Sequence, residues 1–466
     1  MAALRSVADL PTPPGSLPIV GSMRDLLDST SMHRTYERWI DEVGPYFRVE
    51  IPGQTLVVVA DHAVMGEMMR ARPDTFRRWR HQQKVFTEIT QMVDGVFFSE
   101  GEEWRQQRKL VNAALNMRHL QRYFDLMHTS GCRLHARLNE AADGASYDIT
   151  RLFYCYTVDV TSAIALGHDL NTLENGEAPM QRGLELMFRE GMKRMFAPLP
   201  YWRVLPLRSV RELKSAMAVL EAELVRYLER GKARVAARPE LLDDPENALD
   251  AMLAAQRHDG TFTDAEILSN INVLLTAGED TTANTLGWTS WFLATRPELQ
   301  RRIAEEAEAA FGDDVFPTSL ETVDQLVFTE AVLKESTRLR SVTPMQPLEA
   351  LVDTTVADIA IPAGTVVLTA MRWAADGHGP DGEEFRPDRW LDDGPTPPKT
   401  YAFGAGPRFC PGRNLAFTEA KSALAMLCRD FEFTLDESSP VKEELHFTLV
   451  PVDLRIHLRP RVAVTA

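Results

Sequence analysis

One cysteine near the end of the chain lies in a loop whose composition suits a metal-binding thiolate. Cys410 stands in the segment Phe403–Asn414, among glycines and prolines and between Arg408 and Arg413. Glycine lets a flat ligand come close to the backbone, and proline stiffens the turn and removes N–H donors. The apolar run Leu415–Cys428 predicts a helix, whose first N–H groups and dipole favour an anion just before it. We therefore expect Cys410 to be a thiolate and a metal ligand.

A second polar group interrupts a long helical pattern. Thr263 and Glu266 form a capping box, and no proline follows until Pro297, so we expect one helix of roughly 30 residues and about 45 Å. Inside it lies Ala277-Gly278-Glu279-Asp280-Thr281-Thr282. A threonine hydroxyl can compete for a backbone carbonyl, and a distortion there would open a groove for oxygen and water. The residues alone leave open an amphipathic helix with an incidental polar patch.

Two further pairs stand about one helical turn apart. Trp104 and Arg108 are spaced i,i+4, and Glu335 and Arg338 are spaced i,i+3. An indole N–H and a guanidinium are both donors that can bind a carboxylate. Read alone, however, the first pair is common as surface packing, and an exposed ion pair like the second is worth only a few tenths of a kcal/mol.

Taken together, these motifs resemble those of the cytochrome P-450 family of haem-thiolate monooxygenases, in its soluble, bacterial type. The pattern F-x-x-G-x-R-x-C-x-G resembles the haem-binding signature of that family. It is matched at Phe403, Gly406, Arg408, Cys410 and Gly412. The segments Ala277–Thr282, Glu335–Arg338 and Phe385–Trp390 resemble its A-G-x-[D/E]-T-[T/S], E-x-x-R and F-x-P-x-R-W motifs. The motifs stand in family order, and the resemblance covers nearly the whole chain.

The resemblance implies heme b with Cys410 as the axial ligand of the iron, held between the long central helix and the helix after the cysteine loop. An axial thiolate donates electron density that favours O–O cleavage. The residues expected to contact the cofactor are Trp104, Arg108, Ala277, Gly278, Phe403, Arg408, Cys410 and Gly412. Many family members carry an arginine for the second propionate where this chain has Glu349, so Arg408 is the residue expected there.

Catalytic and structural roles follow from the same resemblance. Thr281 is expected to hydrogen-bond the bound dioxygen, and Asp280 to help relay protons. Glu335, Arg338 and Arg389 are expected to form a buried charge network that braces the cysteine loop, with a structural role.

The substrate pocket is also placed by resemblance. Residues Arg77 to Phe98 show no clean period and match the loop that covers the substrate, and Leu184 to Tyr201 match a flexible lid. An apolar substrate is expected because methionine and aromatic side chains are frequent there. The residues predicted to line the pocket are Phe86, Phe97, Phe98, Met187, Phe188, Leu274, Ala277, Val342, Phe447 and Thr448.

The chain is predicted to be mainly α with small β-sheets, an α+β protein forming one domain over residues 1–466. No Ser/Gly-rich or charged linker divides it, and Leu, Ala, Glu and Arg dominate. The strand-rich parts are expected at about 44–62, 352–371 and 445–458. The expected strand pairs are Tyr46–Ile51 with Gln54–Ala60, Thr354–Ile359 beside Thr365–Ala370, and a last hairpin of Leu445–Val450 and Leu454–Leu458 whose turn faces the pocket.

Composition limits the partners. A net charge of −16, from 51 basic and 67 acidic residues, argues against nucleic acid or an anionic membrane and favours a soluble, cytoplasmic protein, expected as a monomer. The four cysteines form no C-x-x-C, so a disulfide framework and a zinc site are disfavoured. Residues Met1 to Leu10 contain no long apolar run, so we expect no membrane anchor.

Electrons must come from other proteins, because no flavin-binding segment and no cysteine cluster for an iron–sulfur centre is found. We expect a separate ferredoxin or flavodoxin with its reductase. The predicted docking face is a basic patch on the thiolate side, made of Arg105, Arg108, Lys109, Arg408 and Arg413.

The function expected from the resemblance is a monooxygenase that inserts one oxygen atom into an apolar substrate, by hydroxylation or epoxidation. A peroxide-driven peroxygenase is an alternative, and a haem-binding sensor or carrier is another. The acid–alcohol pair Asp280 and Thr281 ranks both lower, because a peroxygenase replaces that pair and a carrier needs no proton relay.

Overall fold

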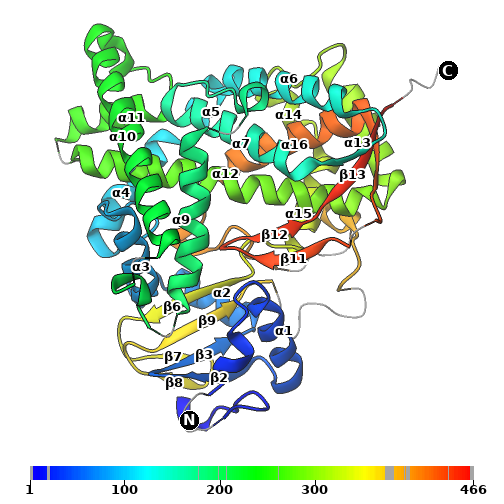
Figure 1. Cartoon of the computed structure of the whole chain (residues 1–466). Helices are drawn as coiled ribbons and strands as arrows, with labels where there is room; N and C mark the ends of the chain where they lie inside the picture. Colours follow the sequence, from blue (N-terminus) through cyan, green and yellow to red (C-terminus); the bar gives the residue numbers. More distant parts are fainter. Residues whose placement is uncertain are drawn as a thin grey trace.

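Long helices form the larger part of the molecule, and a strand-rich part lies to one side of them (Figure 1). The structure is a computed structural model. It describes residues 4–17, 21–176, 178–197, 199–205, 207–260, 262–372, 382–392, 394, 399–438 and 440–461. Within them, no helix is both long and apolar enough to cross a bilayer.

The helices confirm the mainly α prediction. They are α1 (Met32–Val43), α2 (His62–Arg70), α3 (Arg80–Thr90), α4 (Gly101–Ala114), α5 (Met117–Arg122), α6 (Phe124–Ala141), α7 (Ile149–Leu166), α8 (Thr172–Asn175), α9 (Pro179–Met195), α10 (Arg208–Ala237), α11 (Ala248–Asp259), α12 (Asp264–Ala294), α13 (Pro297–Phe311), α14 (Leu320–Asp324), α15 (Val327–Leu339) and α16 (Arg413–Asp430).

The strands form small sheets. They are β1 (Arg5–Ser6), β2 (Tyr46–Ile51), β3 (Gln54–Val59), β4 (Phe76–Arg78), β5 (Ser146–Asp148), β6 (Met345–Ala350), β7 (Thr354–Val356), β8 (Ile359–Ile361), β9 (Val366–Ala370), β10 (Phe431–Leu435), β11 (Lys442–Leu445), β12 (Leu449–Val452) and β13 (Arg455–Pro460). The largest sheet has the order β2-β3-β9-β6-β4, with β3 and β9 parallel. The predicted hairpin of β2 and β3 is confirmed.

Helix α12 runs unbroken through the middle of the helical part and packs along α7. The Thr263 side chain accepts a hydrogen bond from the N–H of Glu266, and the Glu266 carboxylate accepts one from the N–H of Thr263, so the predicted capping box is present. A Cβ at Gly278 would lie 2.8 Å from the Thr161 hydroxyl, so the glycine lets α7 and α12 approach closely. The expected groove for oxygen and water stays a prediction.

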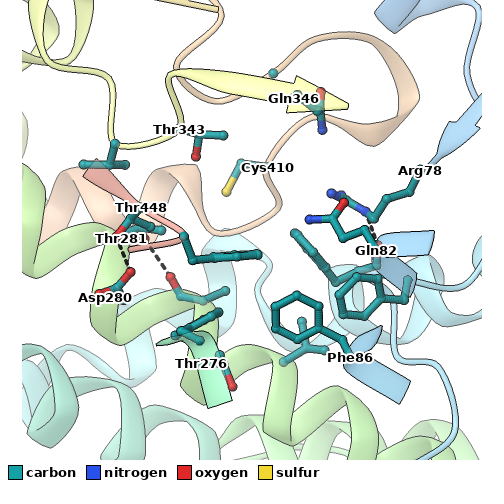
Figure 2. A pocket seen from close by; sticks show the side chains of 18 of the residues that line it. Arg78, Gln82, Phe86, Thr276, Asp280, Thr281, Thr343, Gln346, Cys410 and Thr448 are labelled. Carbon is teal, nitrogen blue, oxygen red and sulfur yellow. Dashed lines mark hydrogen bonds between the residues drawn. The ribbon is translucent and has the colours of Figure 1, made fainter. Parts of the chain in front are cut away.

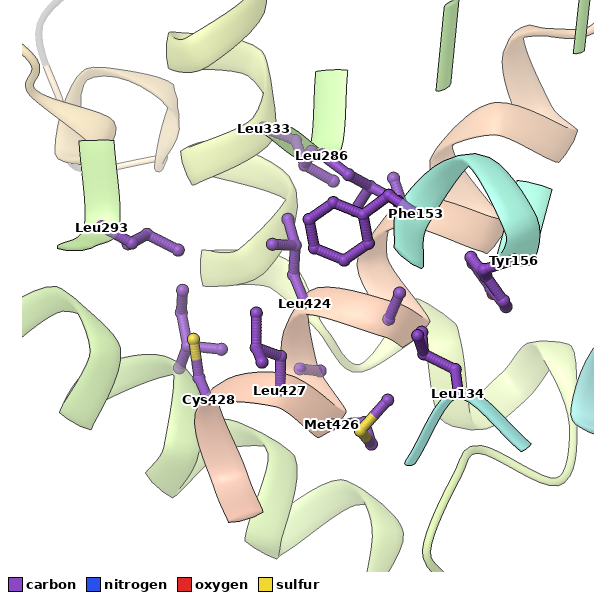
Figure 3. Close-up of a cluster of buried hydrophobic side chains, with 14 of the residues drawn as sticks. Leu134, Phe153, Tyr156, Leu286, Leu293, Leu333, Leu424, Met426, Leu427 and Cys428 are labelled. Atoms are coloured by element: carbon purple, nitrogen blue, oxygen red, sulfur yellow. The ribbon is translucent and has the colours of Figure 1, made fainter. Parts of the chain in front are cut away.

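The main apolar core lies where α7, α12, α15 and α16 meet (Figure 3). Phe153, Leu286, Leu424 and Leu427 are fully buried in it, and burying one such side chain is worth about 1.5–3 kcal/mol. Cys428 lies in the same cluster, where burial raises the pKa of its thiol to about 12. This cysteine is therefore a packing residue, and α16 is fixed firmly behind the cysteine loop.

Three expectations about local structure are wrong. Residues Arg77 to Phe98 contain strand β4 and helix α3, not simply a loop. The expected strand Thr354–Ile359 is divided by a turn into the antiparallel pair β7 and β8.

The last hairpin is also misplaced. The expected strand Leu445–Val450 contains the turn itself, because β11 pairs with β12 across His446–Thr448. Strand β13 pairs with β10 and β5 and does not belong to that hairpin. The turn that reaches the pocket is therefore the one between β11 and β12.

Candidate functional site

A cavity of about 580 Å³ lies between α12 and the cysteine loop. Every residue predicted for the cofactor, for catalysis or for substrate lines it. These are Trp104, Arg108, Ala277, Gly278, Asp280, Thr281, Phe403, Arg408, Cys410 and Gly412, together with Phe86, Phe97, Phe98, Met187, Phe188, Leu274, Val342, Phe447 and Thr448. The structure thus brings together residues from several helices and loops that are far apart in sequence.

The cysteine loop is held tightly in place. The Cys410 N–H donates to the Phe403 carbonyl oxygen at 2.8 Å, and the Phe409 N–H donates to the Gly406 carbonyl oxygen at 3.1 Å. Gly406 has φ 67°, and a Cβ there would lie 2.6 Å from the Met69 carbonyl oxygen on α2. Only glycine fits this position, because it needs both a positive φ and close packing on α2.

The Cys410 sulfur points into the cavity, toward the helix that carries Asp280 and Thr281 (Figure 2). Burial raises the pKa of its thiol, although the N–H groups of Gly412 and Arg413 and the charge of Arg108 act to lower the pKa. Contacts within the loop thus favour the thiolate, and burial opposes it. A coordinated metal ion would deprotonate the thiol, so the chemistry of the donor suits an iron ligand.

Across the cavity, α12 presents an alcohol and an acid. The Thr281 hydroxyl donates to the Ala277 carbonyl oxygen at 2.6 Å, so its oxygen keeps its lone pairs as acceptors on the cavity side. The Asp280 carboxyl accepts from Tyr154 at 2.8 Å and from Asn284 at 3.1 Å, and Thr448 also donates to it. Burial raises the pKa of this carboxyl, and the three hydrogen bonds oppose that shift.

One end of the cavity is rich in buried positive charge. Arg108 donates to the Phe409 carbonyl oxygen at 2.8 Å, and the Arg408 guanidinium lies 4.6 Å from the Trp104 ring centroid. Arg408 also forms an ion pair of 2.7 Å with Glu100. These residues are the predicted propionate contacts, and the structure places them side by side on the cavity wall.

Sequence reasoning missed two members of this group, Arg72 and Arg78. They are 4% and 8% exposed, and Arg78 lines the cavity, with its Nε donating to the Phe97 carbonyl oxygen at 2.8 Å. Burial lowers the pKa of Arg72 to about 10 and that of Arg408 to about 9. The sequence signal that could have revealed Arg78 is the pair Arg77-Arg78 between the apolar residues Phe76 and Trp79.

This charge cluster tests whether haem fits. Three buried guanidiniums, those of Arg72, Arg78 and Arg408, face one carboxylate among the described residues, that of Glu100. Among the described residues, Arg72 Nε and Nη2 and Arg408 Nε are buried without a hydrogen-bond partner. Buried charges need partners, so this end of the cavity calls for added negative charge. Two propionates supply it, and the residues therefore fit haem.

Glu349 lies outside this group. It is in β6, 8% exposed, and its carboxylate accepts from the Arg80 N–H at 2.9 Å, at the first residue of α3. A carboxylate at a helix N-terminus is stabilised by the free N–H groups and the helix dipole. The acid thus caps α3.

The predicted charge network forms around Glu335. Its carboxylate accepts from Arg338 at 2.8 and 2.9 Å, from Arg389 at 2.9 Å and from the Trp390 indole at 2.7 Å. Glu335 is fully buried, and burial acts to raise the pKa of its carboxyl. The donors outweigh burial, so the pKa is lowered. The network ties α15 to the 3-10 helix η5 (Pro387–Trp390), and none of its residues lines the cavity. That it braces the cysteine loop stays a prediction.

Aromatic side chains form the wall on the substrate side (Figure 2). Phe188 and Phe447 stack with ring centroids 4.6 Å apart, and Phe86 lies 5.3 Å from both Phe98 and Phe447. The Phe97 ring meets the Phe98 ring edge-on at 4.8 Å. The rings come from α3, α9, the β11–β12 turn and the segment before α4, so elements far apart in sequence close this side.

Comparison with known proteins decides the family. Residues 11–458 match the family described as Cytochrome P450. The chain belongs to the cytochrome P450 family. P450s bind haem through a cysteine thiolate, and Cys410 is the one cysteine among the described residues that lines the cavity. The chain is therefore a haem-thiolate monooxygenase with the P450 fold.

Named relatives span most of the chain. Human "25-hydroxyvitamin D-1 alpha hydroxylase, mitochondrial" is 30% identical over 484 residues, covering 97% of this chain and 92% of the relative. Human "Steroid 17-alpha-hydroxylase/17,20 lyase" is 27% identical over 456 residues, covering 91% and 86%. "Protein LUTEIN DEFICIENT 5, chloroplastic" of Arabidopsis thaliana is 24% identical over 441 residues, covering 90% and 72%.

Proposed function

We propose that this P450 inserts one oxygen atom of dioxygen into an apolar organic substrate, by hydroxylation or epoxidation, with two electrons from separate redox proteins. One observation carries the proposal: the Cys410 sulfur and the pair Asp280 and Thr281 line facing sides of the same cavity. When bound, haem supplies the reduction of dioxygen and the cleavage of its O–O bond.

In this proposal, proton delivery belongs to α12. The Thr281 oxygen accepts a hydrogen bond on the cavity side while its own proton stays on the Ala277 carbonyl oxygen. Burial raises the pKa of Asp280, so its carboxyl holds a proton more readily than an exposed aspartate. Asp280 is then the proton donor, and Thr281 fixes where the proton goes.

The haem propionates would be held by Trp104, Arg108 and Arg408, with Arg78 as a further contact. Arg78 takes the place of the arginine that many P450s carry where this chain has Glu349. Charge balance supports this, since one carboxylate faces three buried guanidiniums.

The substrate is expected to be large and mainly apolar, because aromatic rings and Met187 form one wall. The names of two relatives concern a steroid and a vitamin D derivative, so sterols belong in a screen with terpenoids, fatty acids and aromatic molecules. The shift of the ferric haem from low to high spin reports which class binds.

The electron donor is proposed to be an acidic ferredoxin or flavodoxin. The predicted basic patch needs one correction: Arg108 and Arg408 are buried and cannot contact a partner. Arg105, Lys109 and Arg413 are exposed around the cysteine loop, and Arg105 is paired with Asp74. Lys109 and Arg413 are the residues on which docking should depend most. The cytoplasmic location, the monomeric state and the soluble bacterial type stay predictions.

A single-turnover experiment separates this function from the alternatives. The monooxygenase converts a high-spin-shifting substrate with a reductase system and dioxygen. A peroxygenase converts the substrate with hydrogen peroxide alone at a comparable rate. A carrier forms no product with either oxidant. Product from peroxide only, or no product from either, would overturn the proposal.

A further inference from the structure

The Asp280 carboxyl is held by side chains from three elements. Tyr154 on α7 donates to Oδ1 at 2.8 Å, Asn284 on α12 donates to Oδ1 at 3.1 Å, and Thr448 from the β11–β12 turn donates to Oδ2. Asn284 also donates to the Tyr154 oxygen at 2.8 Å, to the Asp280 carbonyl oxygen at 2.8 Å and to the Thr448 hydroxyl oxygen at 3.2 Å. Oδ1 is therefore fixed by two packed helices, whereas Oδ2 depends on one residue of a turn.

The turn that carries Thr448 is strained. Phe447, just before it, has φ 100°, which a side chain with a Cβ rarely adopts. Such a conformation persists only where its surroundings hold it, and strain of this kind is comparable with the worth of one hydrogen bond. Relief of the strain at Phe447 would therefore offset part of the cost of losing the Thr448 hydrogen bond.

The ring of Phe447 lies where a substrate would touch it. It stacks on Phe188 of α9 at 4.6 Å and lies 5.3 Å from Phe86 of α3, both of which line the cavity. Figure 2 shows Thr448 beside Asp280 and Thr281, with Phe86 across the cavity. A bulky molecule in this cavity would contact this ring, and Thr448 is the next residue along the chain.

We propose that Thr448 is a positioning residue for Asp280, and that a bulky ligand acts through Phe447 to release Oδ2 toward Thr281. Without such a ligand, the Thr448 hydroxyl keeps Asp280 Oδ2 in a hydrogen bond. When the cavity is filled, the turn shifts and the acid becomes free to serve Thr281. This inference rests on the proposed role of Asp280 as the proton donor, and it links proton delivery to the presence of substrate.

Infrared difference spectra of the holoprotein test it without turnover. The probes are imidazole, a single ring that binds the haem iron, and clotrimazole, which carries three aryl rings on the same azole. A carboxyl band that is absent in Asp280→Asn is assigned to Asp280. In the wild type, clotrimazole should shift this band and imidazole should not.

Variants then separate positioning from simple packing. Thr448→Val should show the shifted band before any probe is added, with no further change on adding clotrimazole, and Thr448→Ser should behave as wild type. Phe447→Ala should keep the original band in both states. Thr343→Val, at a cavity threonine with no bond to Asp280, is the control. In addition, peroxide formed without substrate should rise about threefold or more in Thr448→Val only.

Two outcomes would overturn the inference. One is a band in Thr448→Val that matches the wild type, and the other is an equal shift with imidazole and clotrimazole. Failure of the proposed function is recognised separately in the single-turnover experiment, where product would form from peroxide only or from neither oxidant.

Discussion

Arg78 shows how neighbours set what a single side chain can bind. Its guanidinium lies 3.6 Å from the Phe97 ring centroid, and its Nε is used by the Phe97 carbonyl oxygen. Burial and the charges of Arg72 and Arg408 hold its pKa well below the ordinary value. A cation in this position gains most from an added carboxylate, which suits a haem propionate.

Arg78→Gln should therefore weaken haem binding. Removing one charge-assisted hydrogen bond should lower the affinity for haem about tenfold, since tenfold is about 1.4 kcal/mol. The rate of haem transfer from the protein to apomyoglobin measures this loss of haem affinity. Arg77→Gln is the matched control, because Arg77 does not line the cavity and donates to Gln83. Equal transfer rates in the two variants would remove Arg78 from the propionate site.

Thr281→Ala should keep haem bound while diverting electrons to hydrogen peroxide. The variant removes the oxygen that accepts on the cavity side and leaves α12 intact, because alanine suits a helix. Peroxide formed per NAD(P)H oxidised is the readout, and we expect an increase of roughly tenfold, in the usual range for one acid–base group. Thr285→Ala, one turn along α12, is the control. Unchanged coupling would mean that Thr281 has no part in proton delivery.

At the scale of elements, one acid fastens β11 to α1. Glu443 accepts from His33 at 2.8 Å and pairs with Arg34, Arg340 and Arg372 at 2.9 to 3.0 Å. Burial opposes ionisation, yet these donors outweigh it and lower the pKa of Glu443 from 4.5 to about 2. Because the pKa is lower in the folded state, its stabilisation is full above pH 4.5 and is lost as pH falls toward 2.

Glu443→Gln should consequently destabilise the protein at neutral pH by about 3 kcal/mol and flatten the acid side of its stability curve. Thermal unfolding at pH 7 measures the first effect, and thermal unfolding followed between pH 5 and pH 3 measures the second. Glu444→Gln, the next residue, is the control, since among the described residues its carboxylate pairs with His446, which is itself partly exposed. A wild-type slope in Glu443→Gln would contradict the assigned pKa.

Sequence pattern predicted the long elements well and the short ones poorly. The capping box at Thr263 and the absence of proline defined α12, because both signals are local. Helix α3 was missed because Glu349, distant in sequence, supplies its cap. The β11–β12 turn was missed because Phe447 adopts a positive φ without glycine, so the apolar run reads as one strand.

In the site, too, local motifs could be predicted from the sequence and contacts between distant segments could not. Cys410, Thr281 and Glu335 could be predicted, because each stands in a motif with fixed spacing. Arg72 and the hydrogen bonds from Tyr154 and Thr448 to Asp280 could not, because they depend on tertiary contacts between distant segments.

At the scale of the molecule, a chain of net charge −16 keeps exposed basic residues beside its cysteine loop. Lys109→Glu and Arg413→Glu should each raise the KM for an acidic ferredoxin several-fold, about 3 to 10 times, at low salt, and the effect should fade as salt screens it. Arg208→Glu, at the start of α10, is the control. If all three variants behave alike, the docking face lies elsewhere.

The bond between the Cys410 sulfur and haem iron is tested most directly by the carbon monoxide difference spectrum of the reduced protein. Wild type should show the strongly red-shifted band of thiolate-ligated haem. Cys410→Ser, compared with Cys155→Ser as a control for a buried cysteine elsewhere, should lose that band. A red-shifted band that survives in Cys410→Ser, or is absent from haem-replete wild type, would contradict the account.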